Sequence, residues 1–262
     1  MSFNLIFILS IIGSIMKTTK IFQTNITEIT INELAKILTT TRGNLVAICN
    51  ANTLVRCARD RHVRKVVENF TIKTADGFPV AKSLSIFTKK KHLRVDGYKV
   101  LMKTLEHGLE SNTKHYFFGN DDDVVQLMIK NIKNIFPNIN ISGYLCPKYM
   151  EADELVSEYK NNFHSIDADI IWVSLGFPKQ EVFINKLNNE ENLDFNFVGI
   201  GAVFEWVAGT KIKAPESIAN LGLEWILRLI QEPTRLFRRY AIDIPFFVFF
   251  FLKQLFRKNN SN

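Results

Sequence analysis

Residues 169–181 read DIIWVSLGFPKQE, and this stretch decides the fold class more clearly than any other part of the sequence. Its apolar beginning is typical of a buried β-strand. The run stops at Gly176, the chain turns at Pro178, and polar residues typical of a helix N-terminus follow. A strand that leads through a short glycine turn into a helix is the repeating unit of α/β proteins.

The same alternation continues on both sides of this unit. Apolar runs predict strands at 45–49, 71–75, 115–118, 139–144, 169–175 and 195–200. Charged or periodic segments predict helices at 54–69, 97–110, 122–135, 152–163 and 180–188, and residues 76–79 are predicted to form a turn. This order predicts an α/β fold in which helices flank a mainly parallel sheet.

Length and composition fit one large domain with room for a small appendage. The chain has 262 residues, of which 47% are hydrophobic and 23% charged, which excludes intrinsic disorder. Three scattered cysteines are too few for a disulfide framework or a four-ligand zinc site. The sequence has no HExxH or GxSxG motif, which disfavours zinc enzymes and serine hydrolases. It also has neither the GxGxxG nor the GxxxxGK[ST] motif, so no common nucleotide-binding motif identifies a bound nucleotide.

The first 16 residues, MSFNLIFILSIIGSIM, are apolar and uncharged. They are fewer than the roughly 20 residues of a spanning helix, and they lack the basic start of a signal peptide. Three interpretations stay open: a weak membrane anchor, a signal peptide, or a leader read from a misplaced start codon. We expect the folded core over residues 17–222, because domain-like patterning begins directly after Met16.

Residues 223–262 are expected to form a separate basic and phenylalanine-rich appendage. The chain carries a net charge of +7, and the segment from Arg228 onward holds seven basic and two acidic residues. Its apolar run, Ile244–Leu252, spans nine residues, about half a bilayer crossing. This composition suits a helical segment in the lipid headgroup region, and the alternative is a terminal helix docked in a core groove.

Small or polar residues follow several predicted strands, where α/β proteins bind ligands. Asp76 is a candidate general base, although Asp-Gly pairs commonly only stabilise turns. Asp121–Asp123 could hold Mg²⁺, but acidic residues at a helix start are expected from capping alone. Lys179 and the tail arginines suit phosphate binding. An isolated arginine such as Arg94 is usually only solvated.

Six stretches together resemble the WecG/TagA/CpsF family of bacterial glycosyltransferases, glycosyltransferase family twenty-six. In chain order they are CNANTLVRCARD, ADGFPV, LRVDG, HYFFGN, DADIIWVSLGFPKQE and VGIGAVFEWVAGTKIKAPESIANLGLEWILRLIQEPTRLFRRY. The last stretch is long and very specific, and LGFPKQE within the fifth is moderately specific. The resemblance extends from about Lys20 to Tyr240 and does not include the apolar leader.

This resemblance implies a Rossmann-like fold and an inverting, metal-independent transfer that uses no cofactor. The donor would be a UDP-sugar, often of the N-acetylmannosamine type, and the acceptor a sugar linked through pyrophosphate to a polyprenyl lipid. Such an enzyme would work in cell-surface polysaccharide synthesis, in the cytoplasm at the inner face of the plasma membrane. The oligomeric state stays open, and a homo-oligomer is compatible with the sequence.

The resemblance also assigns roles to individual residues. Asp76 takes the general-base role. The substrate-binding residues would be Asn50, Arg94, Gln180, Arg228, Arg235, Arg238 and Arg239. The nucleotide-binding residues would be Gly119, Gly176, Lys179, Gly201 and Glu205. The tail arginines would belong to an appendage that closes over the site at the membrane.

Three positions depart from the family pattern. Ile48 stands where the family often has Thr, Lys99 where it often has Asp, and Glu205 where it usually has Asp. These differences leave a hexose donor such as UDP-glucose open. They also motivate one rival, a non-catalytic relative that binds a nucleotide sugar or lipid phosphate. The positive charge motivates a second rival, a nucleic-acid-binding module, but its clustering beside the phenylalanine run favours a membrane.

Overall fold

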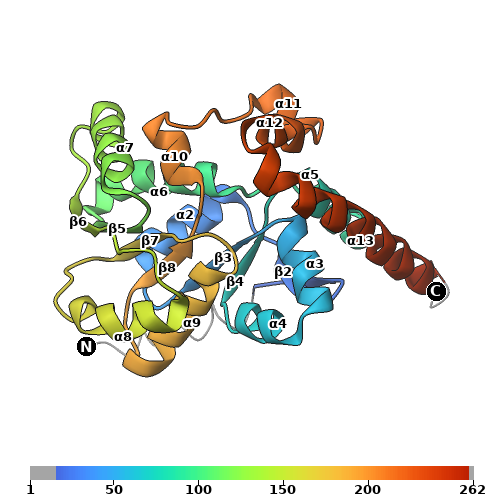
Figure 1. The fold of residues 1–262 in the computed structure, drawn as a ribbon, viewed down its shortest axis with the longest axis horizontal. Coiled ribbons are helices and arrows are strands. Elements are labelled where there is room, and N and C mark those ends of the chain that lie inside the picture. Colours follow the sequence, from blue (N-terminus) through green and yellow to red (C-terminus); the bar gives the residue numbers. More distant parts are fainter. Residues whose placement is uncertain (1–15, 260–262) are drawn as a thin grey trace.

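The computed structural model describes residues 16–259 and contains one six-stranded parallel sheet with helices on both faces (Figure 1). The sheet order is β4-β3-β8-β7-β5-β6. Its strands are β3 (Leu45–Cys49), β4 (Ile72–Ala75), β5 (His115–Gly119), β6 (Ile141–Leu145), β7 (Ile170–Ser174) and β8 (Asn196–Gly199). This confirms the predicted Rossmann-like α/β fold. The expected apolar leader lies outside the described residues, except for Met16.

Alternate side chains of the sheet enter two separate hydrophobic cores. In β7 every residue is buried, with Ile171 and Val173 in one core and Ile170 and Trp172 in the other. Successive side chains of a strand point to opposite faces, so a strand covered on both faces must be apolar throughout. This is why DIIWVSL was the clearest strand signal in the sequence.

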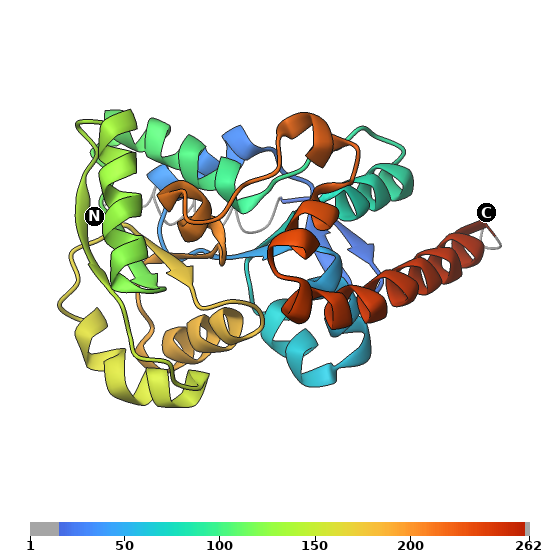
Figure 2. The ribbon, with the colours of Figure 1, turned by 45° about the horizontal axis from the view of Figure 1, so that its top comes forward.

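The helices divide between the two faces (Figures 1 and 2). One core includes residues of α3 (Ala51–Arg59), α4 (Arg61–Glu68), α5 (Phe78–Thr88), α8 (Ala152–Phe163) and α9 (Lys179–Glu191). The other includes residues of α2 (Ile31–Thr40), α6 (Gly97–Ser111), α7 (Asp122–Ile135) and α10 (Val203–Ala208). The helix that follows β3, α3, thus packs on one face of the sheet, and the helix that follows the neighbouring β8, α10, packs on the other. Such a divergence opens a crevice at the carboxyl ends of the strands.

Several local features differ from the sequence expectations, and helices α2, α5 and α10 were not among the predicted helices. A short antiparallel hairpin, β1 (Thr18–Ile21) and β2 (Thr24–Thr27), precedes the main sheet and was not predicted. The segment 54–69 is not one helix but two, because Asp60 ends α3 and caps α4 with its side chain. The predicted turn at 76–79 is shorter, because α5 already begins at Phe78 with a proline in its first turn.

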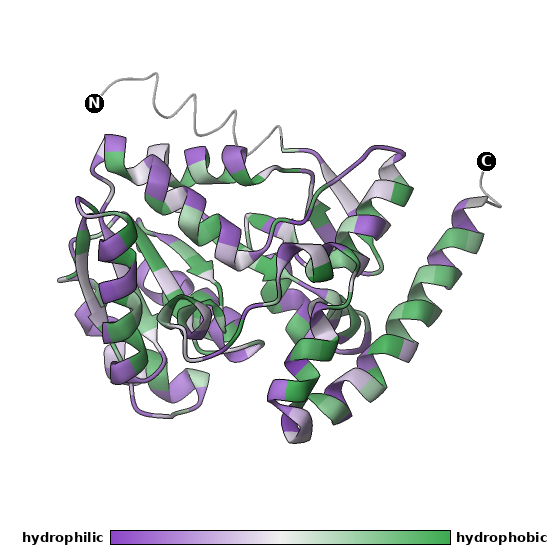
Figure 3. Ribbon diagram, turned by 90° about the horizontal axis from the view of Figure 1, so that it is seen from above, coloured by the Kyte–Doolittle hydropathy of each residue, from purple (hydrophilic) through white to green (hydrophobic). Residues whose placement is uncertain are grey.

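The C-terminal part consists of α11 (Glu216–Asn220), α12 (Glu224–Gln231) and the 27-residue helix α13 (Pro233–Asn259). We call α12 and α13 the appendage. In Figure 3, α13 extends to one side of the molecule, with hydrophobic residues along much of its length. No helix within residues 16–259 has the length and apolar character needed to cross a bilayer.

One side of α13 docks on the N-terminal hairpin and on α5. The ring of Phe22 contacts Phe247 and Phe250 at centroid distances of 5.0 and 5.7 Å, and Phe87 contacts Phe251 at 5.7 Å. Gln254 adds hydrogen bonds to the backbone of the hairpin. Other apolar side chains of α13, such as Phe249 and Phe256, remain exposed. The docked side agrees with the interpretation of a terminal helix in a core groove, and membrane contact of the exposed side stays a prediction.

Candidate active site

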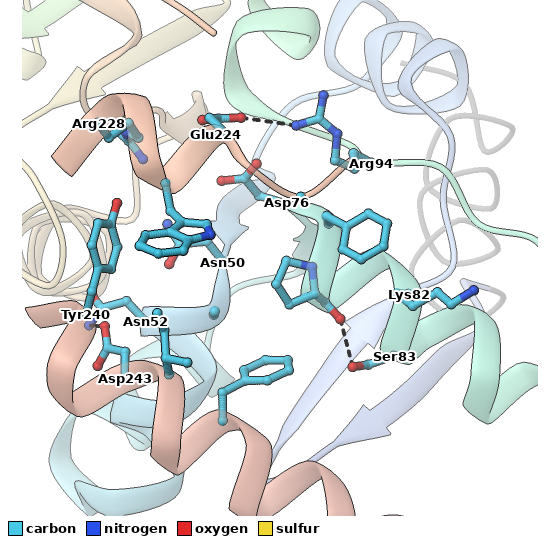
Figure 4. A pocket seen from close by; sticks show the side chains of 18 of the residues that line it. Asn50, Asn52, Asp76, Lys82, Ser83, Arg94, Glu224, Arg228, Tyr240 and Asp243 are labelled. Atoms are coloured by element: carbon cyan, nitrogen blue, oxygen red, sulfur yellow. Dashed lines mark hydrogen bonds and ion pairs between the residues drawn. The ribbon is translucent and has the colours of Figure 1, made fainter. Parts of the chain in front are cut away.

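A cavity of about 470 Å³ lies between the carboxyl ends of β3 and β4, helix α5 and the appendage (Figure 4). The sheet side supplies Asn50, Asp76 and Arg94, three residues singled out from the sequence. The appendage supplies Arg228 and Arg239, two more of them. Polar groups from segments that are far apart in the chain thus meet in one concave site, as expected of a ligand pocket.

Asp76 directly follows β4 and its backbone is fixed on both sides. Its N–H donates to the carbonyl of Cys49 at 2.9 Å, and the preceding carbonyl of Ala75 accepts from Val95 N–H at 3.0 Å. Gly77 then takes a φ of 77°, which a side chain would disfavour, and this turn leads into α5. The half-buried Asp76 carboxyl is therefore presented to the cavity by a rigid strand end.

Burial raises the pKa of Asp76 to about 7, and the nearby carboxylates of Glu224 and Asp96 contribute to the rise. The arginines Arg228 and Arg94 act in the opposite direction but do not cancel it. A carboxyl group with a pKa near the working pH can accept a proton from a substrate hydroxyl more readily than an ordinary aspartate. The environment of Asp76 thus suits a general base.

Arg94 is buried and points toward the appendage (Figure 4). Its Nη1 donates to the carboxylate of Glu224 at 3.1 Å, and Nη2 lies 3.7 Å from Glu216. Neither Nε nor Nη2 has a hydrogen-bond partner among the described residues. A buried guanidinium with unused donors is equipped to bind an anionic or hydroxylated ligand.

Asn50 and Asn52 stand at the start of α3, beside the cavity. Asn50 is the N-cap, and its side-chain oxygen accepts from Thr53 N–H at 3.2 Å. Asn52 donates to the buried carboxylate of Asp243 on α13 at 2.7 Å, and Arg239 lies 3.5 Å from the same carboxylate. The end of the sheet and the appendage are thus joined by direct polar contacts at the cavity wall.

The appendage wall also contains stacked aromatic and cationic side chains. The rings of Trp225 and Tyr240 meet edge to face at 5.8 Å, which holds α12 against α13. The guanidinium of Arg228 lies 4.9 Å from the centre of the Trp206 ring on α10. Such contacts orient Arg228 without neutralising its charge.

Comparison with known proteins assigns the family. Residues 19–261 match the Glycosyl transferase WecG/TagA/CpsF family. The chain belongs to this family. It is therefore a glycosyltransferase, and the resemblance inferred from the six sequence stretches is confirmed.

Two curated relatives carry the same name, N-acetylglucosaminyldiphosphoundecaprenol N-acetyl-beta-D-mannosaminyltransferase. The chain is similar to that of Bacillus subtilis (strain 168), with 26% identity over 212 residues, which cover 81% of this chain and 80% of the relative. It is also similar to that of Bacillus spizizenii, with 26% identity over 215 residues and the same coverage.

In this glycosyltransferase, the predicted nucleotide-binding residues lie at the same edge of the sheet but do not line the cavity. Gly119 ends β5, Gly176 follows β7, and Gly201 follows β8, next to β3. At Gly119 the backbone has a φ of 108°, and a Cβ there would collide with the carbonyl of Ser174. Glycine at this position therefore allows β5 and β7 to end in close contact.

Other predicted binding residues are engaged within the protein. Lys179 donates to the carbonyl of Met150 at 3.0 Å and lies 4.0 Å from the centre of the Tyr149 ring. Glu205 pairs with Lys211 at 2.7 Å, and Lys211 also pairs with Glu232 at 2.9 Å. The roles assigned to these residues stay predictions, because their side chains would have to exchange partners to bind a nucleotide.

Gln180, Arg235 and Arg238 also lie apart from the cavity lining. Gln180 is buried, donates to Glu181 at 2.9 Å, and has an oxygen atom without a partner in the described structure. Arg235 pairs with Glu232 in the same helical turn, and Arg238 is exposed. Their predicted substrate contacts are likewise untested by this geometry.

Sequence reasoning did not single out several polar residues of the cavity lining, namely Asn52, Lys82, Ser83, Glu224, Tyr240 and Asp243. Glu224 lies inside the quoted stretch GLEW, and Asn52 lies two residues after the predicted Asn50. Their position in the sequence, close to residues that had been assigned a role, was thus the available signal. It gave no indication that Glu224 would lie beside Asp76 and Arg94.

The acidic triplet Asp121–Asp123 lies at the start of α7, with Asp121 at the N-cap and the other two in the first turn. Acidic groups at this end of a helix interact favourably with the helix dipole. Within the described part of the chain, no group of three or more His, Cys, Asp or Glu side chains is placed to hold a metal ion.

Proposed function

We propose that the enzyme moves a hexose or N-acetylhexosamine, of the N-acetylmannosamine type, from a UDP-sugar to a sugar carried on a polyprenyl diphosphate. The relatives are named for transfer of N-acetylmannosamine to a diphosphoundecaprenol-linked N-acetylglucosamine. The observation that supports the proposal most strongly is a carboxyl group with a pKa of about 7 in a cavity lined by three arginines.

In the proposed reaction, the acceptor hydroxyl loses its proton to the Asp76 carboxylate as its oxygen forms a bond to the anomeric carbon of the donor. The bond from that carbon to the diphosphate breaks on the opposite side, and UDP leaves with the electron pair. Attack opposite to the leaving group inverts the anomeric configuration. A single carboxylate is sufficient for this step, because no covalent sugar–enzyme intermediate is needed.

The departing UDP gains negative charge, which must be stabilised without a metal ion in the proposed mechanism. Arg94, Arg228 and Arg239 face the cavity and are suited to this task. The carboxyl ends of β5, β7 and β8 offer glycine turns and helix N-termini for the nucleotide. The donor would then lie along the strand ends, with its reactive carbon near Asp76.

We also propose that the enzyme works at the inner surface of the cytoplasmic membrane, where the appendage contacts the lipid headgroups. Phe249 and Phe256 are 56% and 64% exposed on α13, and Lys253 lies between them in sequence. Apolar side chains beside basic ones are typical of helices that lie in a membrane interface. Replacing both phenylalanines by aspartate should abolish sedimentation with anionic liposomes, and continued sedimentation would contradict this contact.

The direct test is a transfer assay with purified enzyme, a polyprenyl-diphosphate-linked N-acetylglucosamine analogue and a panel of UDP-sugars, with and without EDTA. Product from one donor that persists in EDTA supports the proposed donor class and metal independence. Product that disappears in EDTA and returns with Mg²⁺ contradicts metal independence. Absence of product with every donor, while UDP still binds, contradicts the proposed acceptor or favours a non-catalytic role.

A further inference from the structure

The two ends of the cavity differ in chemical character. Asp76, Arg94 and Arg228 line one end, as described above. Further along α13 the lining consists of apolar side chains, namely Ile244, Phe247, Val248 and Phe251, and the facing helix α5 contributes Phe78 together with the polar Lys82 and Ser83. A nucleotide, a sugar and a diphosphate are polar, so none of them requires this second end.

Two of the apolar side chains on α13 are held in place by contacts with the rest of the protein. Phe247 is only 9% exposed and packs edge to face on Phe22, while Phe251 packs on Phe87. These contacts anchor α13 to the hairpin and to α5. The apolar surface that faces the cavity is therefore part of the folded structure and does not depend on a ligand to form.

Other apolar side chains that line the cavity remain partly exposed to solvent. Ile244 and Val248 are 43% and 50% exposed on α13, one helical turn apart, and Phe78 is 39% exposed on the opposite α5. A contiguous apolar surface inside a concave site typically marks the binding place of an apolar ligand group. Covering it would remove hydrocarbon from water and stabilise the complex.

Arginine side chains lie beside this apolar surface. Arg239 and Tyr240 line the cavity on the same helix, one turn before Ile244 and Asp243. Nε of Arg239 is buried, makes no hydrogen bond among the described residues, and lies 3.5 Å from the carboxylate of Asp243. A ligand that continues from a diphosphate into a hydrocarbon chain matches this order of groups along α13.

We propose that the apolar end of the cavity binds the first isoprene units of the acceptor lipid, with the diphosphate beside Arg228 and Arg239. This inference rests on the proposed function, which supplies a polyprenyl diphosphate acceptor. The groove between α5 and α13 then acts as a lipid subsite of the enzyme itself, in addition to any contact between the appendage and a membrane. It positions the acceptor sugar toward Asp76.

The test measures binding of diphosphates with one, two and three isoprene units: dimethylallyl, geranyl and farnesyl diphosphate, without detergent and below their aggregation concentrations. We expect the affinity for the diphosphate to rise about tenfold or more from one to two isoprene units, because each buried methylene or methyl group strengthens binding. Ile244→Asn should remove most of this dependence on chain length. Ile242→Asn is the matched control, because Ile242 is 38% exposed on the same helix but does not line the cavity.

Equal affinity for all three diphosphates in the unmodified enzyme would overturn the lipid subsite, even if sugar transfer is observed. The same holds if Ile242→Asn and Ile244→Asn reduce the chain-length dependence equally. If the dependence is present and specific to Ile244, but no sugar is transferred from any donor, the subsite stands and the proposed function fails. Circular dichroism of both variants shows whether each retains the helical fold.

Discussion

The two walls of the cavity are built in different ways. Asp76 and Asn50 stand at strand ends, where hydrogen bonds of the sheet and of α3 fix the backbone. The appendage wall is attached through side chains, including the Asn52–Asp243 hydrogen bond and the contact of Phe22 with Phe247. The difference shows that the sheet fixes the position of the Asp76 carboxyl, whereas the appendage adds two of the charges that act on its pKa, those of Glu224 and Arg228.

The largest effect is expected from removing the proposed proton acceptor, Asp76, on the sheet wall. Asp76→Asn should lower kcat by about 10²- to 10⁴-fold, the usual contribution of a general base. The affinity for UDP, measured by calorimetry, should stay within a small factor of the unmodified enzyme, because the fold and the arginines remain. Equal turnover in the variant would contradict the role of Asp76.

A smaller but substantial effect is expected from the appendage wall. Arg228→Ala should reduce kcat/KM by about 10- to 100-fold, because one charged donor facing the diphosphate is lost. Arg56→Ala, which removes an exposed arginine on α3, serves as the control and should leave the rate unchanged. Similar losses in both variants would indicate a general effect of charge and would contradict a specific role for Arg228.

The attachment of the appendage can be tested through stability. Phe247→Ala should lower the free energy of unfolding by about 3 kcal/mol, because it opens a cavity between α13 and the hairpin. Phe249→Ala, on the exposed side of the same helix, should change it by less than about 1 kcal/mol. Urea denaturation compares the two, and equal values would mean that α13 is not docked as described.

The smallest change is expected from Glu224→Gln, which alters the charge but not the shape of the cavity. The negative charge of Glu224 contributes to the raised pKa of Asp76, so its removal should lower that pKa. Since the proposed base, Asp76, would act in its ionised form, activity should persist to lower pH in the variant. Glu216→Gln is the control, because Glu216 also faces Arg94 but is not among the charges that raise the pKa of Asp76.

If the acidic limb of the pH–activity profile does not shift in Glu224→Gln, the electrostatic link between the two walls is contradicted.

The free energy of unfolding should also depend on the ionisation of Asp76. The folded protein holds the proton of Asp76 more tightly than the unfolded chain, so stability contributed by this group is present at pH 4 and is lost as the pH rises through about 7. Asp76→Asn should therefore gain stability over the unmodified enzyme at pH 8 and not at pH 4.

The sheet wall was largely predictable from the sequence pattern, whereas for the appendage wall the family resemblance named Arg228 and Arg239 but not the contacts that hold it in place. Apolar runs such as Ile170–Ser174 specify buried strands by themselves, and polar residues after them mark the ligand-binding edge. The contacts of Glu224 with Arg94, or of Asp243 with Asn52, join residues 130 and 191 positions apart. Helical periodicity shows that such segments are helices, but it does not show which groove they occupy.

The N-terminal hairpin illustrates the same limit. Thr18–Ile21 and Thr24–Thr27 are short and polar, so no pattern in the sequence distinguished them from a loop. Their importance comes from Phe22 at the turn, whose ring contacts two phenylalanines of α13. The phenylalanine run of the tail could therefore be assigned to a docked side and a free side only after the hairpin was placed.

The most direct test of the central claim is the pH dependence of kcat/KM for the unmodified enzyme. We predict that kcat/KM rises with pH through a single ionisation with an apparent pKa of about 7, the value of the Asp76 carboxyl. The same ionisation should be absent from the residual activity of Asp76→Asn. A rate that is constant from about pH 5 to 9, or an acidic limb near 4 as for an ordinary aspartate, would contradict the claim that the cavity raises the pKa of its base.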